Sequence, residues 1–557
     1  MTARCLDLSD ERARDAAVAG AKAAGLAAAS AAGLPTLPGV VVPVGESDPV
    51  VRAASTTLLG EGVARARLAA MTVQPDEPLL AELRERAACF PAPMIVRSSS
   101  PLEADGTWSG AFSSFHGVGP DDLGTAVRGC WGSAFQVGSL ERAHHTGTDP
   151  TRLGLAVLVQ PEVAPGIGGT ARRRFDGSVQ VTATRGPLSP LMSGQVEGTV
   201  TVVGADDTIK AVDVERDLLL EVASLSRRVH EVLDHQLIEW AEVDGKVHLL
   251  QSIRSADRPA QVAGDRELDA IAGSDVAVRV AGLTQRFPGR LGYELILPWA
   301  VADGPLRRTA HTTAGPDPGV DPVALLAATR SLSRELTAMV WRRSPRAAAA
   351  EAERMLRLLR GDAPEAALRI LQGLPGPSPD AVQRVLGNLE SLRRTALARG
   401  VVDSDAAFWR LGPDDLDRGL RSGAAPGESR LGVDRWEPFA HHVVMATGTH
   451  VAGTPAAPGA GVGRAYVADS AMPRPVPSGR CVLVANQPVP SLAPLLWNAA
   501  GLVTRAGSAG AHLIEFAHSI GVPTVVGCDV PDPERVGPDP VVAVDGSRGL
   551  VSVASLP

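Results

Sequence analysis

Hydrophobic patterning changes character twice along this chain, near residue 260 and again near residue 449. The first stretch mixes helical and strand patterns, the second carries helical periodicity, and the third is rich in Gly and Val with short strand-like runs. Helices repeat every 3.6 residues and strands every two, so these stretches call for different packing layers. With 557 residues, each stretch is long enough to bury a core. The sequence predicts an α+β multidomain protein with parts at 1–256, 257–448 and 449–557.

The first part is expected to combine a helix with short buried strands. A helix is predicted over 18–33, ended by Gly33 and Pro35. Two runs rich in strand-forming residues, 238–243 and 247–251, flank Asp244 and Gly245, which predicts a hairpin. Further strands are predicted at 40–44, 94–96, 155–159 and 179–184.

The middle part is predicted to be mostly helical. Pro and Gly residues at 314–319 and 373–378 separate its periodic segments. Arginine clusters at 342–346 and 393–394 are interpreted as solvated helix faces, and nothing in this part encodes a substrate. The predicted helices cover 321–342, 346–360, 363–373 and 379–399.

The C-terminal part contains a β-α-β unit with a histidine at its loop–helix junction. A strand over 502–504 runs into small residues, and His512 begins a helix that Gly521 ends before a strand at 524–526. Free N–H groups at a helix start favour an anion, and an imidazole there can carry a phosphoryl group. On the residues alone, a neutral histidine packed at the helix start is the favoured interpretation.

This unit resembles the phosphohistidine domain of the dikinase, or phosphoenolpyruvate-utilising, family. The stretch 453–459 also resembles the start of that domain. The resemblance implies a swivelling β/β/α domain in which His512 is the catalytic phosphoryl carrier. The matching positions of the unit are Thr504, Gly507, His512, Ala517, 522–523 and 525–527.

Residues 15–256 resemble the ATP-grasp half of the same family. The resemblance implies that ATP is the phosphoryl donor and that Mg²⁺ is required. Lys22 provides a compact charge and Arg97 a two-pronged fork for phosphate oxygens. The implied ATP-binding residues are Lys22, Arg97, Gly110, Gln160, Glu239, Gln251 and Arg254, with Glu239 and Gln251 also as metal ligands.

The hairpin gives a geometric reason for that metal pair. If the strands register symmetrically about Asp244 and Gly245, Glu239 and Gln251 fall nearly opposite each other. Side chains of paired residues share one face of a sheet, so the two can chelate one ion. On its own, the hairpin also fits an ordinary edge ribbon with a solvated glutamate.

Several positions depart from the family pattern, and three of them bear on the chemistry. The glutamate of the family motif that aligns with 186–194 falls on Ser189, and a hydroxyl residue before the histidine falls on Ala511. The family arginine after the metal glutamine falls on Ile253. Arg254 can replace it only if the strand shifts by one residue, because such a shift moves a side chain to the other face of the sheet.

Composition excludes several classes of protein. Acidic residues outnumber basic ones by 62 to 54 and no basic run occurs, which argues against nucleic acid as a partner. No apolar stretch approaches the ~20 residues of a membrane helix. The five cysteines are scattered without metal spacing, and an acidic N-terminus lacks a secretory pattern, so a cytoplasmic protein is expected. The basic residues include only three lysines, Lys22, Lys210 and Lys246.

The chain ends shortly after His512, which leaves no room for the family's pyruvate-binding barrel and resembles the layout of the rifampicin phosphotransferase branch. The expected function is transfer of the ATP β-phosphoryl group through phospho-His512 to a hydroxyl of a small-molecule acceptor. The sequence does not identify that acceptor. An antibiotic or secondary metabolite is the acceptor class implied by this branch. Two alternatives stay open: phosphorylation that activates a biosynthetic intermediate for elimination or condensation, and a nucleotide-binding pseudo-dikinase without turnover.

Overall fold

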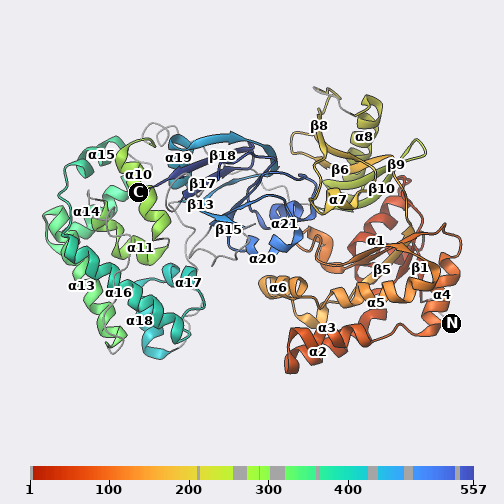
Figure 1. The fold of residues 1–557 in the computed structure, drawn as a ribbon, viewed down its shortest axis with the longest axis horizontal. Coiled ribbons are helices and arrows are strands. Elements are labelled where there is room, and N and C mark those ends of the chain that lie inside the picture. The colour runs from red at the N-terminus through yellow and green to blue at the C-terminus, as the bar shows by residue number, and fades with distance from the viewer. Residues whose placement is uncertain are drawn as a thin grey trace.

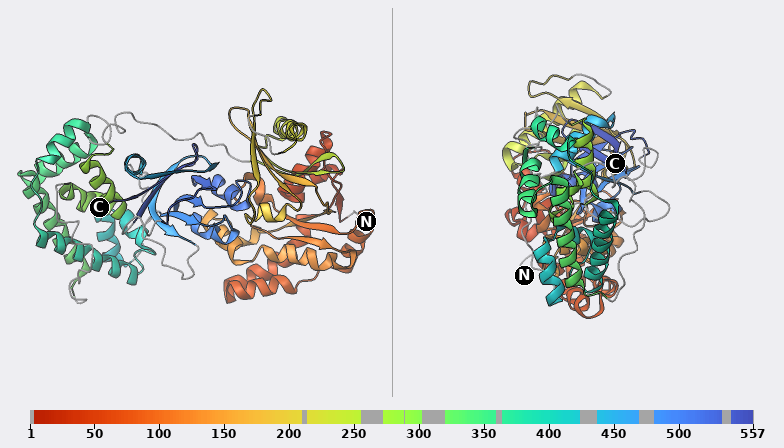
Figure 2. Two further views of the ribbon diagram at one scale, coloured as in Figure 1. Left: turned by 45° about the horizontal axis from the view of Figure 1, so that its top comes forward. Right: turned by 90° about the vertical axis from the view of Figure 1, so that its left-hand side faces the viewer.

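The computed structural model describes residues 4–209, 214–254, 272–287, 289–301, 320–358, 364–423, 437–468, 481–532 and 540–556. It is a mixed helix-and-sheet, multidomain protein. An N-terminal part has two five-stranded sheets, a helical part follows, and an eight-stranded sheet lies near the C-terminus. Figures 1 and 2 show this last sheet between the other two parts. The boundary predicted at 256–257 lies outside the described residues.

The first sheet has the strand order β1-β2-β5-β3-β4 with antiparallel pairing. Alternate residues enter two cores: Val40 and Val42 pack with α4 and α5, whereas Val41 packs with α1. The elements are β1 (Leu6–Asp7), β2 (Val40–Val42), β3 (Met94–Ser99), β4 (Ser114–Val118), β5 (Ala156–Pro161), α1 (Ala16–Ala31), α2 (Asp48–Glu61), α3 (Val63–Thr72), α4 (Glu77–Ala87), α5 (Leu123–Ser133) and α6 (Val137–Thr146).

The second sheet has the order β10-β9-β6-β7-β8, again antiparallel. The predicted hairpin is confirmed: Asp244 and Gly245 have φ values of 52° and 75°, as a type I′ turn requires. Helix α8 shares a core with this sheet and with α1. The elements are β6 (Ile167–Arg173), β7 (Val179–Arg185), α7 (Ser189–Met192), β8 (Thr199–Val203), α8 (Arg216–Leu233), β9 (Leu237–Val243) and β10 (Lys246–Ile253).

The helical part confirms the four helices expected from periodicity. Each of them begins at a proline, because a first-turn residue needs no N–H for the helix ladder. Among the helices described, none is long and apolar enough to cross a bilayer. The elements are α10 (Asp275–Arg286), α11 (Arg290–Leu295), α12 (Leu297–Ala300), α13 (Pro322–Trp341), α14 (Pro345–Arg357), α15 (Pro364–Gln372), α16 (Pro379–Ala398), α17 (Asp405–Arg410), α18 (Pro413–Ser422) and α19 (Glu437–Thr447).

The C-terminal sheet has the order β11-β18-β17-β13-β14-β15-β16-β12. Strands β13 to β16 run parallel, and alternate residues of β14 face α20 and α21 on one side and a second Val-rich core on the other. The elements are β11 (Thr449–Ala452), β12 (Thr454–Ala457), β13 (Ala460–Val467), β14 (Cys481–Ala485), α20 (Ala493–Leu496), β15 (Ala499–Thr504), α21 (His512–Ile520), β16 (Thr524–Val526), β17 (Pro540–Asp545) and β18 (Leu550–Ser555).

Helix α19 joins the helical part to the C-terminal sheet. Its Phe439 and Val443 are buried in the same core as Val462 of β13 and Val541 of β17. That core continues without a break into the remaining helices. Separating the two parts would expose this apolar surface to water, which is unfavourable in proportion to the area exposed.

Helix α1 docks on the first sheet through a kink at Gly20. Gly20 has φ 72° and ψ 162°, a conformation that side chains rarely allow. The N–H of Ala21 donates to the carbonyl of Ser100 at 2.9 Å, and the N–H of Ala23 donates to Oγ of Ser99 at 3.1 Å. A Cβ added at Gly20 would lie 2.1 Å from the Ser99 carbonyl oxygen. The kink therefore fixes the part of α1 that carries Lys22.

We predict that Gly20→Ala destabilises the N-terminal part by more than about 3 kcal/mol, since strain and backbone overlap combine. Gly33→Ala is the matched control: its φ is 73°, but nothing lies within 4 Å of an added Cβ, so it should cost only about 1–2 kcal/mol. Denaturant unfolding followed by circular dichroism measures both. Equal losses for the two variants would contradict the steric account.

Candidate functional site

His512 stands at the junction of a tight loop and a helix. Strand β15 ends at Thr504, and α21 begins at His512 after a loop of small residues. Inside the loop, Oγ of Ser508 accepts the N–H of Gly510 at 3.0 Å, so this hydroxyl is used by the loop itself. Ala511 precedes the helix without a side-chain cap, because alanine has no acceptor to offer. His512 is therefore positioned by the backbone and by what packs against it.

Gly110, a predicted site residue, lies directly against His512. A Cβ on Gly110 would be 2.8 Å from Cβ and 3.2 Å from Cγ of His512. Gly110 also has a positive φ of 66°. The two segments are more than 400 residues apart in sequence, so this contact brings the C-terminal sheet and the N-terminal part together at the histidine.

Charged residues of the N-terminal part surround the imidazole. Burial lowers the pKa of His512; the negative charges of Glu239 and Glu515 oppose this, whereas the positive charges of Lys22 and Arg97 lower it further. The side chain is half-buried. The balance favours the neutral imidazole, which is the form that has a free nitrogen lone pair.

Lys22 is paired with a carboxylate that the site prediction did not include. Its Nζ lies 2.6 Å from Oε1 of Glu103 and donates to the Ser98 carbonyl at 3.3 Å. Oε2 of Glu103 accepts the N–H of Ser100 at 2.9 Å in a capping box. The Ser-x-x-Glu spacing was the available sequence signal for a fixed Glu103.

Glu239 and Gln251 lie next to each other in a row of side chains that crosses the second sheet. The row runs Thr170, Glu239, Gln251 over β6, β9 and β10, so the three side chains share one face. The symmetric register would pair Glu239 with Leu250, and a bulge between Leu249 and Gln251 moves Gln251 opposite Glu239. The predicted juxtaposition is therefore confirmed, with a bulge as its cause.

The same row fits a divalent cation. Glu239 is 6% and Gln251 5% exposed, and Oε1 of Glu239 has no hydrogen-bond partner among the described residues. A buried carboxylate oxygen without a partner is costly unless a ligand satisfies it. No group of three or more His, Cys, Asp or Glu that could hold a metal occurs in the described part of the chain. Mg²⁺ characteristically takes few protein ligands and keeps water.

Arg97 bridges the two sheets of the N-terminal part. It extends from β3, and its Nη1 lies 4.0 Å from Oε2 of Glu239 and donates to the Leu250 carbonyl at 3.4 Å. The side chain is only 16% exposed. Arg97 is thus held beside the residue pair that fits a cation.

Of the remaining two predicted residues, Gln160 is not brought into this group and Arg254 lies at its exposed edge. Gln160 is buried in β5, and its Nε2 donates to the carbonyls of Leu37 and Pro38 at 3.2 and 3.3 Å. Arg254 is exposed and pairs with Asp234 at 2.9 Å. Ile253, on the neighbouring position, is buried.

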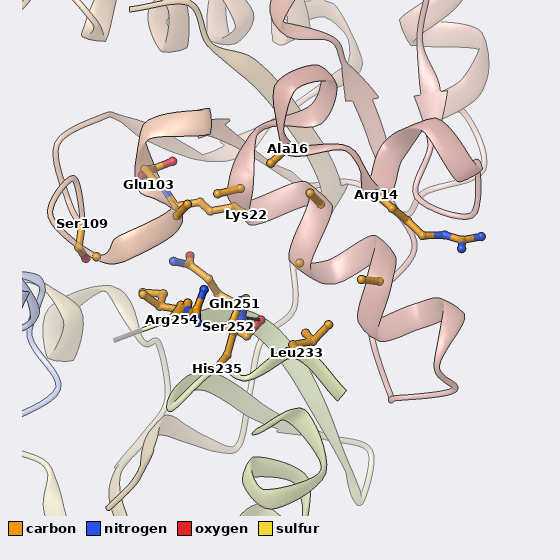
Figure 3. Close-up of a pocket in the computed structure, with 17 residues that line it drawn as sticks. Arg14, Ala16, Lys22, Glu103, Ser109, Leu233, His235, Gln251, Ser252 and Arg254 are labelled. Atoms are coloured by element: carbon orange, nitrogen blue, oxygen red, sulfur yellow. Dashed lines mark hydrogen bonds and ion pairs between the residues drawn. The ribbon is translucent and has the colours of Figure 1, made fainter. Parts of the chain in front are cut away.

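A cavity of about 220 Å³ lies between α1 and the hairpin. Figure 3 shows Lys22 and Glu103 on one wall and Gln251, His235 and Arg254 opposite. Burial lowers the pKa of His235 to about 4, and its Nδ1 lies 2.9 Å from Oγ of Ser252. Neither Arg97 nor His512 lines this cavity. The cavity therefore lies next to the charged residues around His512, on the side where α1 is.

Comparison with known proteins identifies the segment around His512. Residues 477–549 match the family described as PEP-utilising enzyme, mobile domain. This part of the chain is similar to that mobile domain. The match supports an enzyme of the phosphotransferase type that works through a phosphohistidine, and His512 lies within the matched range at the start of α21.

Comparison over the whole chain finds only weak similarities. No curated protein matches the sequence. D-alanine–D-alanine ligase from Helicobacter pylori is similar over 41% of this chain and 51% of its own, with 10% identity and a TM-score of 0.20. The N-terminal domain of Enzyme 1 - Nitrogen is similar over 45% of this chain and 85% of its own, with 19% identity and a TM-score of 0.13. The chain spans about half the length of the ligase, and at these TM-scores neither likeness bears on fold or function.

We predict that His512 remains neutral below the usual histidine pKa of about 6.5. Because its pKa is lowered in the folded protein, acid favours the unfolded chain, and stability falls as the pH drops below about 6.5. His512→Asn should therefore lose less stability than wild type between about pH 7 and pH 5. Thermal unfolding across that range measures this, with exposed His450→Asn as the control that should follow wild type. Parallel curves for wild type and His512→Asn would contradict the prediction.

Proposed function

We propose that this protein is an ATP-dependent phosphotransferase of the dikinase type in which His512 carries the phosphoryl group. The observation that carries the proposal is the position of His512: it begins α21 in a segment similar to a PEP-utilising mobile domain, and it faces Gly110, Lys22, Arg97 and Glu239. In this proposal the N-terminal part is an ATP-grasp domain. The cations hold the triphosphate, and the neutral imidazole acts as the nucleophile.

The first half-reaction uses the neutral state of His512. An imidazole nitrogen attacks the β-phosphorus of ATP, the bond to the α-phosphate oxygen breaks, and AMP leaves. Water then cleaves the γ-phosphoryl group as inorganic phosphate, which leaves phospho-His512. Lys22 and Arg97 lie where they can stabilise the charge that develops on the phosphate oxygens.

Glu239 and Gln251 are the residues that would hold Mg²⁺. When bound, the ion neutralises phosphate charge and aligns the triphosphate. Arg97 lies beside Glu239, so its positive charge offsets the negative charge of that carboxylate when no ion is bound.

The second half-reaction requires the His512 interface to open. Figure 1 places α21 on the side of the C-terminal sheet that faces the N-terminal part. Since α19 binds the sheet to the helical part through a shared core, we place the main movement at the N-terminal interface. Phospho-His512 then transfers its phosphoryl group to an acceptor hydroxyl, the P–N bond breaks, and the hydroxyl proton is released. The acceptor is a small molecule bound by the helical part.

A nucleotide-binding protein without turnover is the second candidate. It is favoured by Ala511, which offers no hydroxyl next to His512, and by Arg254, which pairs with Asp234 at the edge of the cavity. Under this alternative ATP binds but no AMP is formed with any acceptor.

The decisive experiment follows the β-phosphoryl group. With ATP labelled at the β-phosphorus, wild type should become labelled at His512 and release AMP and phosphate, whereas His512→Ala should retain no label. The matched control His450→Ala should behave as wild type, because His450 is exposed on β11. Labelled product from His512→Ala would overturn the scheme. Tight ATP binding without AMP from wild type would favour the alternative.

We predict that Lys22→Arg impairs ATP use even though the charge is kept. Lys22 is 13% exposed and its compact ammonium fits between Glu103 and the Ser98 carbonyl, where a planar guanidinium does not. A drop in the labelling rate of about tenfold or more is expected, equivalent to roughly 1.4 kcal/mol in the barrier. Lys246→Arg, at an exposed hairpin position, is the control and should have no effect. Lys210, the third lysine, lies outside the described residues.

A further inference from the structure

Four residues on one face of α21 contact the N-terminal part. His512 lies against Gly110, Glu515 pairs with Arg172, Phe516 lies under Arg142, and Ser519 approaches Gly106. These positions are spaced at i, i+3, i+4 and i+7, which defines a single helical face. The docking of His512 is therefore coupled to residues one and two turns further along.

Glu515 is buried at the centre of this face. It is 3% exposed, and its Oε2 pairs with Nη2 of Arg172, which is itself only 16% exposed. Oε1 of Glu515 would lie 3.1 Å from a Cβ on Gly106, so a small side chain there would need the carboxylate to shift by only a few tenths of an ångström. Removing one member of a buried ion pair leaves an uncompensated charge, which strongly disfavours the docked state.

Arg172 connects this pair to the site. It lies on β6 two residues from Thr170, so both side chains emerge on the same face of the strand. Thr170 is the cross-strand partner of Glu239, and Gly510 in the loop before His512 packs on Thr170. The ion pair thus sets α21 in register with the row that carries Glu239 and Gln251.

Arg142 provides a second, weaker anchor on the same face. Its guanidinium carbon lies 4.0 Å from the centre of the Phe516 ring, and its Nη1 donates to the carbonyls of Thr107 and Ser109. Those carbonyls belong to the segment that leads into Gly110. The segment under His512 is therefore held by a residue that also contacts α21.

We propose that Glu515, acting through Arg172, is a positioning residue that seats His512 in front of the nucleotide side of the molecule. The catalytic role of this docked position rests on the proposed function. The docking of α21 itself can be measured without catalysis. Breaking the pair should slow the phosphorylation of His512 without changing the affinity for ATP, because neither residue belongs to the Lys22, Arg97 and Glu239 group.

Docking can be read from a disulfide between Gly106→Cys and Ser519→Cys. The Cβ positions of these residues are 3.6 Å apart, within the roughly 3.5–4.5 Å that a disulfide requires. Exposed Cys89 is replaced by Ser in this background, and the other four cysteines are buried. Every variant is compared in the same background, so strain from the positive φ of Gly106 cancels.

Glu515→Gln should slow cross-linking under a mild oxidant by about tenfold or more, and Arg172→Gln should do the same. Exchange of the charges, Glu515→Arg with Arg172→Glu, should restore much of the rate. Glu390→Gln, which breaks the Glu390–Arg393 pair within α16, is the matched control and should cross-link as the parent does.

The same variants without the engineered cysteines are tested for β-phosphoryl labelling of His512 and for ATP affinity. Slower cross-linking with slower labelling and unchanged ATP affinity supports the proposal, and unchanged cross-linking in both single variants overturns it. If wild type itself shows no labelling but Glu515→Gln still cross-links slowly, the positioning role stands and the proposed function fails.

Discussion

The arrangement of the site depends on a close approach between two parts of the chain that leaves no room for side chains. Glycines occur where the C-terminal sheet meets the N-terminal part, and an added Cβ would collide with the opposite side. Gly110 would meet His512 at 2.8 Å, Gly510 would meet Thr170 at 2.3 Å, and Gly194 would meet the Pro488 carbonyl at 2.6 Å. Such spacing allows backbone to approach backbone closely, so the imidazole lies directly against the N-terminal part.

That approach concentrates charge around a neutral histidine. Lys22 pairs with Glu103 and Arg97 lies near Glu239, so each cation is held by a carboxylate. A polyphosphate would compete with these carboxylates for the cations, and a divalent cation at Glu239 would relieve the resulting repulsion. In the absence of ligand, the charges of the site therefore compensate one another.

Local sequence patterns predicted individual helices and strands. They did not predict the contacts between segments that are distant in sequence. Helices over 379–399 and 512–520 followed from periodicity and from the proline and glycine at their ends. The Asp-Gly turn predicted Gln251 within one position of Glu239, and the bulge at Leu250 that brings the two opposite each other leaves no sequence signal. The Glu103–Lys22 and Glu515–Arg172 pairs join residues far apart in sequence, so no local rule could find them. Gln160 was predicted from sequence to bind ATP, but in the structure its amide donates to the carbonyls of Leu37 and Pro38.

The two interfaces of the C-terminal sheet differ in kind. Toward the helical part, α19 buries Phe439, Val443 and Val444 in a continuous apolar core. Toward the N-terminal part, the contacts include an ion pair, a cation–π contact, the stacking of Trp497 on His145 and a hydrogen bond from Gln487 to the Gln195 carbonyl. Water can replace the partners of charged and polar groups, but it cannot replace an apolar core at similar cost. Any opening that exposes His512 should therefore begin at the polar interface and carry the helical part along with the sheet.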